Sequence, residues 1–599
     1  LGYGLLRYVN ERTAPVLASH ATGQIGFNYL GRISTADMPE GLRGLGWTMA
    51  PEAGEYVAEP DADMSATSAV DINAMVTDSA EGTRLTAQFA FPTGVLSHAE
   101  VRELADLWCA ALEALARHAA GPGAGGLTPS DVPLVSVTQR EIEAWERQYP
   151  GLADIWPLTA TQSGLLFHAM LADSTFDAYQ MQLVFHLSGT VDPARMRAAG
   201  QALLNRYPNL RTAFVADAAG NQVQAVVDGI PLPWHAVDLR EMGETERDTA
   251  FERIVADDLN TPFDPAAPPL LRMTLVSTGP DRAELIFTAH HVLFDGWSLP
   301  LLMQDLLRLY GSGGDPSVLP RARGYRDFLV WLAAQDRTES ARAWAAEFDG
   351  LDEPTLLAAG LEPRTGLSGI GHVEAELSVQ DARGLARRAA ELGVTLNTLV
   401  QGAWAVVLGE LTGCQDVVFG ATVSGRPPAL AGVDSMVGLF ISTLPVRVRC
   451  APGEPLAELL TGLQGRQAAL LDHHHYGLAD IQQATGLPSL FDTLVVYESF
   501  PLDRAGIAEA NTTAGVAVTG IRPATGTHYP LTVMATADPH LRLSFDYQHN
   551  LYEQETVAGI ADRLVRVLRQ LVADPGRRVG AVELLEPAEL EVLRGFNDT

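Results

Sequence analysis

The segment at 285–310 restricts the fold more than any other, because it predicts a strand, a sharp turn and a helix in direct succession. LIFTAHH at 285–291 is an apolar, β-prone run typical of a strand. In SLPLLMQDLLRLY at 298–310 the apolar residues recur at i, i+3, i+4 and i+7, which is one face of a helix with Ser298 as its expected N-cap. Strands and helices alternate over most of the chain, so the sequence predicts an α/β fold.

The composition excludes several classes of function. The formal net charge of −32 would repel a phosphate backbone, which argues against nucleic-acid binding. No run approaches the ~20 apolar residues of a membrane helix, and the first residues lack the pattern of a signal peptide. The three cysteines are far apart, which fits a reducing cytoplasm. All 41 basic residues are arginine, so the chain lacks a P-loop or Schiff-base lysine.

The chain also contains an internal repeat. Four segments near the start match four segments in the last third, in the same order. The pairs are 2–8 with 475–481, 27–32 with 491–497, 85–91 with 541–547 and 97–108 with 552–564. Residues 1–120 are therefore expected to copy the last third of the chain without the part that precedes it, so that the chain begins in mid-domain. A linker rich in Gly and Pro is predicted over 121–150.

The turn sequence HHVLFDG at 290–296 has four interpretations. Adjacent His290 and His291 on a strand point to opposite faces, which argues against one shared metal ion, and no HEXXH motif is found. A serine hydrolase would need a G-x-S-x-G elbow, which is also missing. A structural role is possible, but no turn or capping rule requires two imidazoles here. The fourth is acyl transfer to an amine, because a neutral imidazole accepts the amine's proton or holds the amine at attack distance.

HHVLFDG resembles the HHxxxDG signature of nonribosomal peptide synthetase condensation domains, within the chloramphenicol acetyltransferase-like superfamily. Six further segments resemble motifs of this family in the expected order, and the resemblance covers about 150–590. They are PLTATQSGLLFHAML (157–171), NRYPNLRTAFV (205–215), YRDFLVWL (325–332), MVGLFISTLPVRV (436–448), HHHYGLADIQQATG (473–486) and LFDTLVVYESFP (490–501). One departure is Ser442, where the family usually has Asn.

The residues within two sets of motifs resemble one subtype of condensation domain. SGLLFHAML, YPNLRTAFV and LFDTLVVYE resemble condensation domains that join a D-configured donor to an L-configured acceptor. GYGLLRY (2–8), FNYLGR (27–32), APE (50–52) and LTPSDVPLV (127–135) resemble the C-terminal half of an epimerization domain, without the half that carries its own histidine motif. The order fits, since an upstream epimerase would make the D-residue that the condensation domain accepts.

The resemblance implies a role for each residue of the turn. His291 is expected to be catalytic, as a general base or as a group that positions the amine, and His290 to be structural. Asp295 is expected to form a buried structural ion pair with Arg211, because a buried carboxylate needs a partner. Gly296 would let a thioester approach the backbone and offer its N–H to the developing oxyanion.

Four further residues are candidate substrate contacts, each with a plainer alternative. The alternative for Trp297 is a place in the tunnel wall or the core. The alternative for Ser298 is a helix cap rather than a nucleophile. His528 and Tyr529 belong to THYPLTVM (527–534), which resembles a strand lining the cleft, and ordinary sheet packing explains them equally well. The run from His473 to His475 is expected at a helix start or loop, with a solvated role. No metal site is predicted.

The expected architecture is two similar α/β lobes of the chloramphenicol acetyltransferase type, 151–330 and 331–588, arranged as a V with His291 in a tunnel at the base. Residues 1–120 would be a truncated epimerization lobe, and 589–599 would begin a connector to a following domain.

The resemblance also implies the partners. Upstream and downstream peptidyl carrier domains would bring the substrates on 4'-phosphopantetheine arms, with no cofactor bound directly, and adenylation and epimerization domains of the same synthetase would be neighbours. A cytoplasmic location is expected, with no membrane or nucleic-acid partner. The alternatives are a non-catalytic scaffold that recruits partner enzymes and a free-standing acyltransferase that uses coenzyme A.

Overall fold

The computed structural model describes residues 2–597 except 21–22, 34–65, 67, 80–81, 122–123, 172–177, 368, 499–503, 538–539 and 586. It divides the chain into two compact units, Leu1–Gly126 and Leu127–Thr599. The division falls within the stretch rich in Gly and Pro that the sequence predicts to be a linker.

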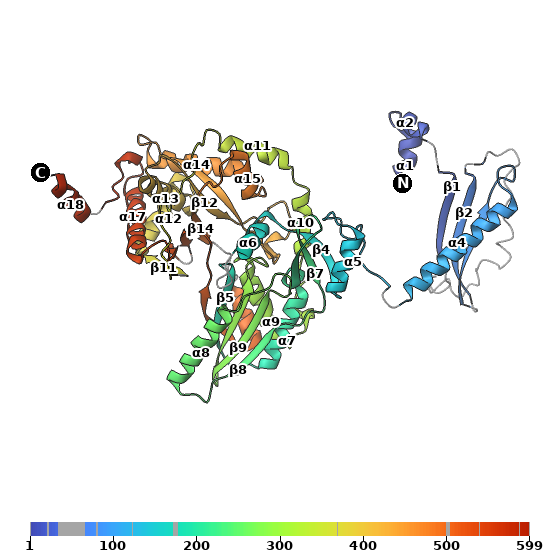
Figure 1. The fold of residues 1–599 in the computed structure, drawn as a ribbon, viewed down its shortest axis with the longest axis horizontal. Helices are drawn as coiled ribbons and strands as arrows, with labels where there is room; N and C mark the ends of the chain where they lie inside the picture. The colour runs from blue at the N-terminus through green and yellow to red at the C-terminus, as the bar shows by residue number, and fades with distance from the viewer. Residues whose placement is uncertain are drawn as a thin grey trace. The chain divides into compact units, whose positions relative to one another are not determined.

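The first unit is built on a sheet of order β1-β2-β3, followed by the long helix α4 (Figure 1). β1 and β2 run parallel, and β2 and β3 antiparallel. α4 begins at a capping box, in which the Ser97 hydroxyl accepts from the N–H of Glu100 and the Glu100 carboxylate accepts from the N–H of Ser97. The elements are α1 (Gly2–Gly4), the π-helix η1 (Leu5–Val9), α2 (Ala14–Ser19), β1 (Ile25–Ile33), β2 (Val70–Ser79), β3 (Gly82–Ala90) and α4 (His98–Ala119).

One large sheet of the second unit has the order β15-β5-β10-β9-β8 and carries helices on both faces. Side chains of β10 alternate between the faces, so Leu285 and Phe287 share a core with α7 and α9, whereas Ile286 shares one with α8. The predicted strand and helix around the turn are confirmed as β10 and α9. The elements are β5 (Gln180–Ser188), α7 (Pro193–Arg206), β8 (Trp234–Asp238), α8 (Glu244–Leu259), β9 (Leu271–Gly279), β10 (Arg282–His290) and α9 (Ser298–Ser312).

The other large sheet has the order β11-β17-β16-β14-β12-β13. Its core on one face, around Trp404 and Phe545, includes residues of α12, α13, α14 and α17, and its core on the other face, around Phe491, includes residues of α11 and α15. The elements are α11 (Arg337–Glu347), β11 (Ile370–Ala375), α12 (Val379–Leu392), α13 (Leu396–Thr412), β12 (Asp416–Val423), β13 (Ser442–Arg449), α14 (Leu456–Leu470), α15 (Leu478–Thr485), β14 (Thr493–Glu498), β16 (Leu531–Thr536), β17 (Arg542–Gln548) and α17 (Gln554–Ala573).

The internal repeat of the sequence is also a repeat of topology. In the second unit β14 pairs parallel with β16, β16 pairs antiparallel with β17, and α17 follows. In the first unit β1, β2, β3 and α4 have the same order and the same directions. The flanks differ, because β12 and β11 extend the sheet beyond β14 and β17, whereas the described strands of the first unit end at β1 and β3.

The predicted linker is too long at its C-terminal end. A small sheet of order β4-β7-β6 (Leu152–Pro157, Gln222–Val227, Thr212–Ala216) packs against α5 (Gln139–Gln148). Ile142 and Trp145 of α5 are buried in the same core as Ile155. Residues from Leu127 onward therefore belong to the second unit, and at the far end α18 (Pro587–Asn597) is helical where a connector is predicted.

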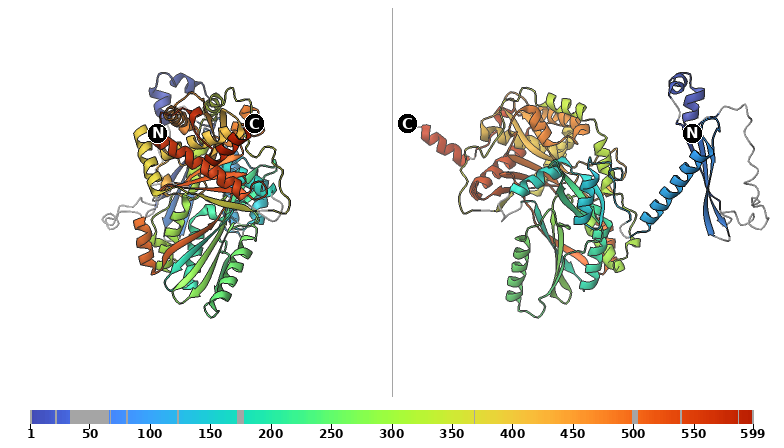
Figure 2. Two further views of the ribbon diagram at one scale, coloured as in Figure 1. Left: turned by 90° about the vertical axis from the view of Figure 1, so that its left-hand side faces the viewer. Right: turned by 45° about the vertical axis from the view of Figure 1, so that its right-hand side comes forward.

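One segment of the second half crosses to the sheet of the first half. α16 (Arg504–Ala514) packs on α9, and β15 (Ala517–Ala524) pairs antiparallel with β5, with Ile521 opposite Phe185. It is visible as an orange strand among the green strands of that sheet (Figure 2). The predicted boundary at 330 does not anticipate this exchange.

Among the described helices, none by itself has the length and apolar content to cross a membrane. α12 and α13 reach that threshold only as a pair, and they are bent by 102° at their junction.

Candidate active site

β10 delivers the two histidines of the HHVLFDG motif to the end of its sheet. His290 is the last residue of the strand, and His291 follows, with its N–H donating to the backbone oxygen of Tyr179 (2.8 Å). The ring of His290 is buried, and its Nδ1 accepts from the N–H of Val292 (3.0 Å). His290 therefore holds the turn itself, which is the structural role that the sequence predicts for it.

His291 keeps partial access to solvent, with its Nδ1 on the buried side. Burial lowers its pKa because the charged imidazolium loses hydration, while nearby backbone groups and the carboxylate of Asp295 act in the opposite direction. The ring is therefore uncharged at neutral pH, which is the form that accepts a proton. An amine close to this ring would meet a base rather than a cation.

Asp295 is fully buried and joins the turn to a segment of the second half. Its Oδ1 accepts from Arg426 Nη2 (3.2 Å), and from the N–H (2.9 Å) and hydroxyl (2.7 Å) of Ser298. Its Oδ2 accepts from the N–H groups of Phe440 (3.0 Å) and Ile441 (3.3 Å). A buried carboxylate with this many donors anchors the turn to the second half.

The predicted partner of Asp295 is wrong, because Arg211 pairs with Asp228. Arg211 is the last residue of a short 3-10 helix (Pro208–Arg211), and its guanidinium also donates to the backbone oxygens of Val227 and Asn205 (both 3.3 Å). Arg426 takes the place beside Asp295 instead. It is buried and donates to the backbone oxygens of Val433 (2.6 Å) and Met436 (2.9 Å), and its guanidinium lies 4.0 Å from the ring centroid of Phe440.

The remaining turn residues divide between network and surface. Ser298 is fully buried, and its hydroxyl contacts Asp295, Arg426 and Gly438, so the predicted substrate contact is corrected to a structural one. It is also the first helical residue rather than the N-cap, which is Trp297. Trp297 is partly exposed and donates to Asp434 O (3.1 Å). Gly296 is partly exposed, and no described residue accepts from its N–H.

A second imidazole lies beside the same strand end. The hydroxyl of Tyr179 hydrogen-bonds to Nδ1 of His528, in the loop before β16. The ring of His528 stacks on His168 of α6 (Ala160–Leu171), with centroids 3.8 Å apart and planes at 18°. Burial first, and then the neighbouring His168, lower the pKa of His528 to about 4, so this ring is uncharged at neutral pH. Tyr179 thus connects the backbone of His291 to a neutral imidazole pair from two other segments.

Of these three residues, only His528 is predicted from the sequence, and Tyr179 and His168 are not. Tyr179 is recognisable only from the pairing of β5 with β10, because that pairing places its backbone opposite His291. His168 lies in the segment quoted at 157–171, but nothing in its spacing marks it. Tyr529 stacks on Phe491 (5.7 Å, 22°) within a hydrophobic core, which favours the sheet-packing interpretation for this residue.

The residues from His473 to His475, which we call the helix-end triplet, lie outside this site. They follow α14, and two of their rings contact Ser340 of α11, at 3.1 Å from His473 Nδ1 and 3.0 Å from His475 Nε2. Trp344 donates to His473 O (3.0 Å). The predicted solvated role therefore gives way to contacts that hold α11. Within the part of the chain that the structure describes, no group of three or more His, Cys, Asp or Glu side chains could hold a metal ion.

The fold and the strand-end site together define the architecture of a condensation domain. The first condensation domain of the calcium-dependent antibiotic synthetase, solved with a substrate analogue, superposes with a TM-score of 0.58 at 24% identity and covers 72% of this chain and 99% of that chain. The complex of the X-domain and OxyB from teicoplanin biosynthesis gives a TM-score of 0.59 at 22% identity, with 72% and 96% covered.

A family model described as Condensation domain matches residues 152–594, so the chain belongs to this family and the predicted condensation domain is confirmed. A linear gramicidin synthase protein of Brevibacillus parabrevis is 31% identical over 100% of this chain and 8% of its own length. Bacitracin synthase 3 of Bacillus licheniformis is 28% identical over 100% of this chain and 9% of its own length. The chain thus spans less than a tenth of the length of either relative.

Proposed function

We propose that this chain forms peptide bonds in nonribosomal peptide synthesis. The α-amine of an acceptor aminoacyl thioester attacks the carbonyl of a donor peptidyl thioester, and both are carried on phosphopantetheine arms of carrier domains. The observations that carry this proposal are the uncharged imidazole of His291, a partly exposed residue directly after β10, and the N–H of Gly296, which no described residue accepts.

The chemistry needs one proton acceptor and one oxyanion donor. As the C–N bond forms, the amine loses a proton, which the imidazole of His291 accepts or helps to transfer. The carbonyl oxygen becomes negative and receives the N–H of Gly296. The C–S bond then breaks, the donor arm leaves as a thiol with the proton, and the amide stays on the acceptor arm. The thioester is already activated, so no covalent nucleophile is required.

Asp295 and Arg426 act through position in this scheme. Their buried network fixes the turn between β10 and α9 against the segment at 436–441 of the second half. The two halves of the second unit then form two lobes arranged as a V, with His291 at the base of the cleft. Orientation of this kind contributes as much to amide formation as proton transfer does.

The donor is proposed to be D-configured, and the first unit to be the C-terminal part of an epimerization domain. The motif wording at 163–171 and 490–498 supports the first point. The shared topology of β1-β2-β3-α4 and β14-β16-β17-α17 supports the second, since both would be pieces of one superfamily.

The two alternative functions, a recruiting scaffold and a coenzyme A-dependent acyltransferase, differ in whether they use His291 and carrier domains. The X-domain, whose solved complex contains OxyB, shares this fold, so a recruiting scaffold is compatible with the fold alone. A scaffold would have no use for an accessible neutral His291. A coenzyme A-dependent acyltransferase would use His291 but would accept its acyl group without a carrier domain.

The test is an assay with carrier domains loaded with D- or L-configured donors, with products identified by mass spectrometry. Amide formed from the carrier-bound D-donor, and little from the L-donor or from coenzyme A thioesters, is the expected result. Equal turnover of coenzyme A thioesters would favour the free-standing acyltransferase. If no loaded carrier gives any product, the non-catalytic scaffold becomes the favoured function.

A further inference from the structure

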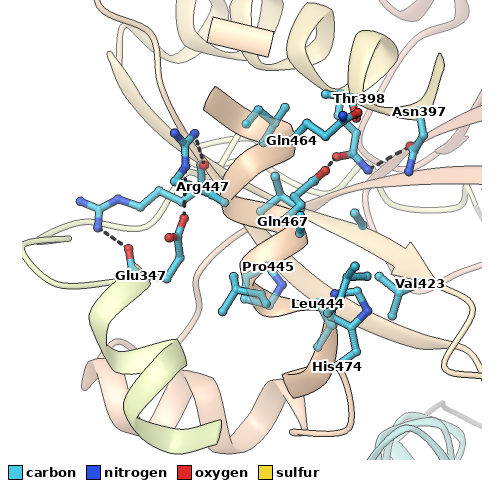
Figure 3. A pocket seen from close by; sticks show the side chains of 18 of the residues that line it. Glu347, Asn397, Thr398, Val423, Leu444, Pro445, Arg447, Gln464, Gln467 and His474 are labelled. Atoms are coloured by element: carbon cyan, nitrogen blue, oxygen red, sulfur yellow. Dashed lines mark hydrogen bonds and ion pairs between the residues drawn. The ribbon is translucent and has the colours of Figure 1, made fainter. Parts of the chain in front are cut away.

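A cavity of about 250 Å³ lies in the second half of the second unit, next to α14 (Figure 3). Its walls come from α11, the first turns of α13, α14, the C-terminal end of β12 and the middle of β13. None of the residues 290–298 lines it. We call it the α14 cavity, and the mechanism above makes no use of it.

The charged groups at one end of the α14 cavity already balance one another. Arg447 pairs with Asp416 (2.7 Å) and donates to the backbone oxygens of Glu347 (2.9 Å) and Asp349 (2.8 Å). Arg466 lies 3.5 Å from the carboxylate of Glu347. A charged ligand would have to displace one of these partners and leave a poorly compensated charge, which is costly in a partly buried site.

The middle of the cavity offers uncharged hydrogen-bonding groups. Gln467 Nε2 donates to Gln401 Oε1 (2.5 Å), and Gln401 donates in turn to Asn397 Oδ1 (3.0 Å). No residue in the described ranges hydrogen-bonds to the amide oxygen of Gln467, which leaves one acceptor open.

His474 supplies the second open group. Its ring forms no hydrogen bond to any residue that the structure describes, and Figure 3 shows it beside Leu444 and Val423. Burial first, and then its neighbours His473 and His475, lower its pKa to about 4. A neutral imidazole presents one donor and one acceptor rather than a positive charge. The remaining wall, with Val423, Leu444 and Pro445, is apolar.

The cavity begins close to the segment that holds Asp295. Val423 pairs with Ser442 across β12 and β13, and the N–H of Ile441 donates to Asp295 Oδ2 (3.3 Å). Leu444 follows Ile441 by three residues, a distance of about 10 Å along extended backbone. The strand that lines one side of the α14 cavity therefore begins next to a residue that holds Asp295.

We propose that the α14 cavity binds an extended, uncharged chain that carries secondary amide groups on an apolar backbone. An amide N–H would donate to Gln467, and an amide oxygen would accept from His474. If the proposed function holds, this chain is part of a thioester substrate, either the pantetheine arm or the peptidyl portion, because both consist of secondary amides separated by saturated carbon.

The test measures binding to the full chain at pH 7 by isothermal titration calorimetry. The probes are pantetheine and N-acetyl-alanyl-alanine methylamide, which are both uncharged and carry no reactive acyl group. Ala468→Trp fills the cavity from the exposed side of α14, and Ala469→Trp is the matched control, since Ala469 is exposed on the same helix but does not line the cavity. At least one probe is expected to bind, with roughly tenfold or greater weakening in Ala468→Trp alone.

The pattern of results separates the sources and the two proposals. Binding of pantetheine alone assigns the cavity to the arm, and binding of the dipeptide alone assigns it to the peptidyl portion. His291→Ala is expected to keep this binding while it loses turnover, because His291 does not line the cavity. A wild-type chain that binds a probe but forms no amide from loaded carriers would count against the proposed function only. The cavity proposal is overturned if neither probe binds at millimolar concentration, or if the two tryptophan variants behave alike.

Discussion

Two groups of adjacent histidines lie in the second unit, and their surroundings differ. The strand-end pair, His290 and His291, sits where β10 stops, in a turn fixed by a buried carboxylate and a buried guanidinium. The helix-end triplet follows α14 and contacts a serine hydroxyl of α11. In the pair His291 is a partly exposed residue, and in the triplet His474 lines the α14 cavity. The comparison shows that adjacent histidines by themselves do not define a kind of site, because the partner that fixes the backbone differs between the two groups.

The largest expected effect separates the two groups by activity. His291→Ala is expected to lower the rate of amide formation roughly 10²- to 10⁴-fold, because the amine loses its proton acceptor and its positioning group. His473→Ala, outside both the site and the cavity, serves as the control and should retain the wild-type rate. Single-turnover kinetics with loaded carrier domains measures both, and near-wild-type turnover by His291→Ala would refute its catalytic assignment.

The next effect separates the anchors of the two groups by stability. Asp295→Ala leaves Arg426 buried without its carboxylate, and the free energy of unfolding is expected to fall by about 3–5 kcal/mol. Asp472, the acidic residue next to the helix-end triplet, is exposed, so Asp472→Ala should change the free energy of unfolding by less than about 0.5 kcal/mol. Urea denaturation of both variants provides the comparison. A fully stable but inactive Asp295→Ala protein would mean that Asp295 has a chemical role.

The smallest effect is a dependence of stability on pH that arises from the triplet. The pKa of His474 is about 4 in the folded chain and rises on unfolding, so below pH 6.5 the unfolded chain binds more protons. The free energy of unfolding should therefore decrease by roughly 2–3 kcal/mol as the pH falls from 6.5 to 4.5, through this group alone.

His474→Gln removes that contribution, while His528, whose pKa is also about 4, contributes equally to both proteins. Urea denaturation between pH 7 and 4.5 should give a flatter curve for His474→Gln than for the wild type. Superimposable curves would show that His474 is not protonated on unfolding.

Local patterns were enough to predict part of the fold and the family. The helical spacing at 298–310 and the β-prone run before it gave α9 and β10, because both depend on periodicity within one segment. The repeat between the two ends of the chain predicted a shared arrangement of strands, which the matching topology supports. The condensation-domain motifs pointed to the family that residues 152–594 match.

Contacts between distant segments could not be predicted in the same way. Arg426 lies 131 residues from Asp295, and nothing local distinguishes it from Arg211, whose guanidinium is satisfied by nearby backbone oxygens and Asp228. The contact of Tyr179 with His291 could be predicted only with knowledge of the register of β5 against β10. The helix α5 was hidden because it follows a stretch rich in Gly and Pro, although Thr138 and Glu141 form a capping box that marks its start.

β15 comes from the second half of the second unit but pairs with β5 in the sheet of the first half. This exchange limits where the chain can be cut to make chimaeric proteins. A fragment ending at residue 330 would leave β5 as an open edge with unpaired backbone groups, and such edges promote aggregation. A fragment starting there would contain a strand with no sheet to join. Chimaeras should therefore exchange the second unit as a whole, because no structural boundary lies at the midpoint of its sequence.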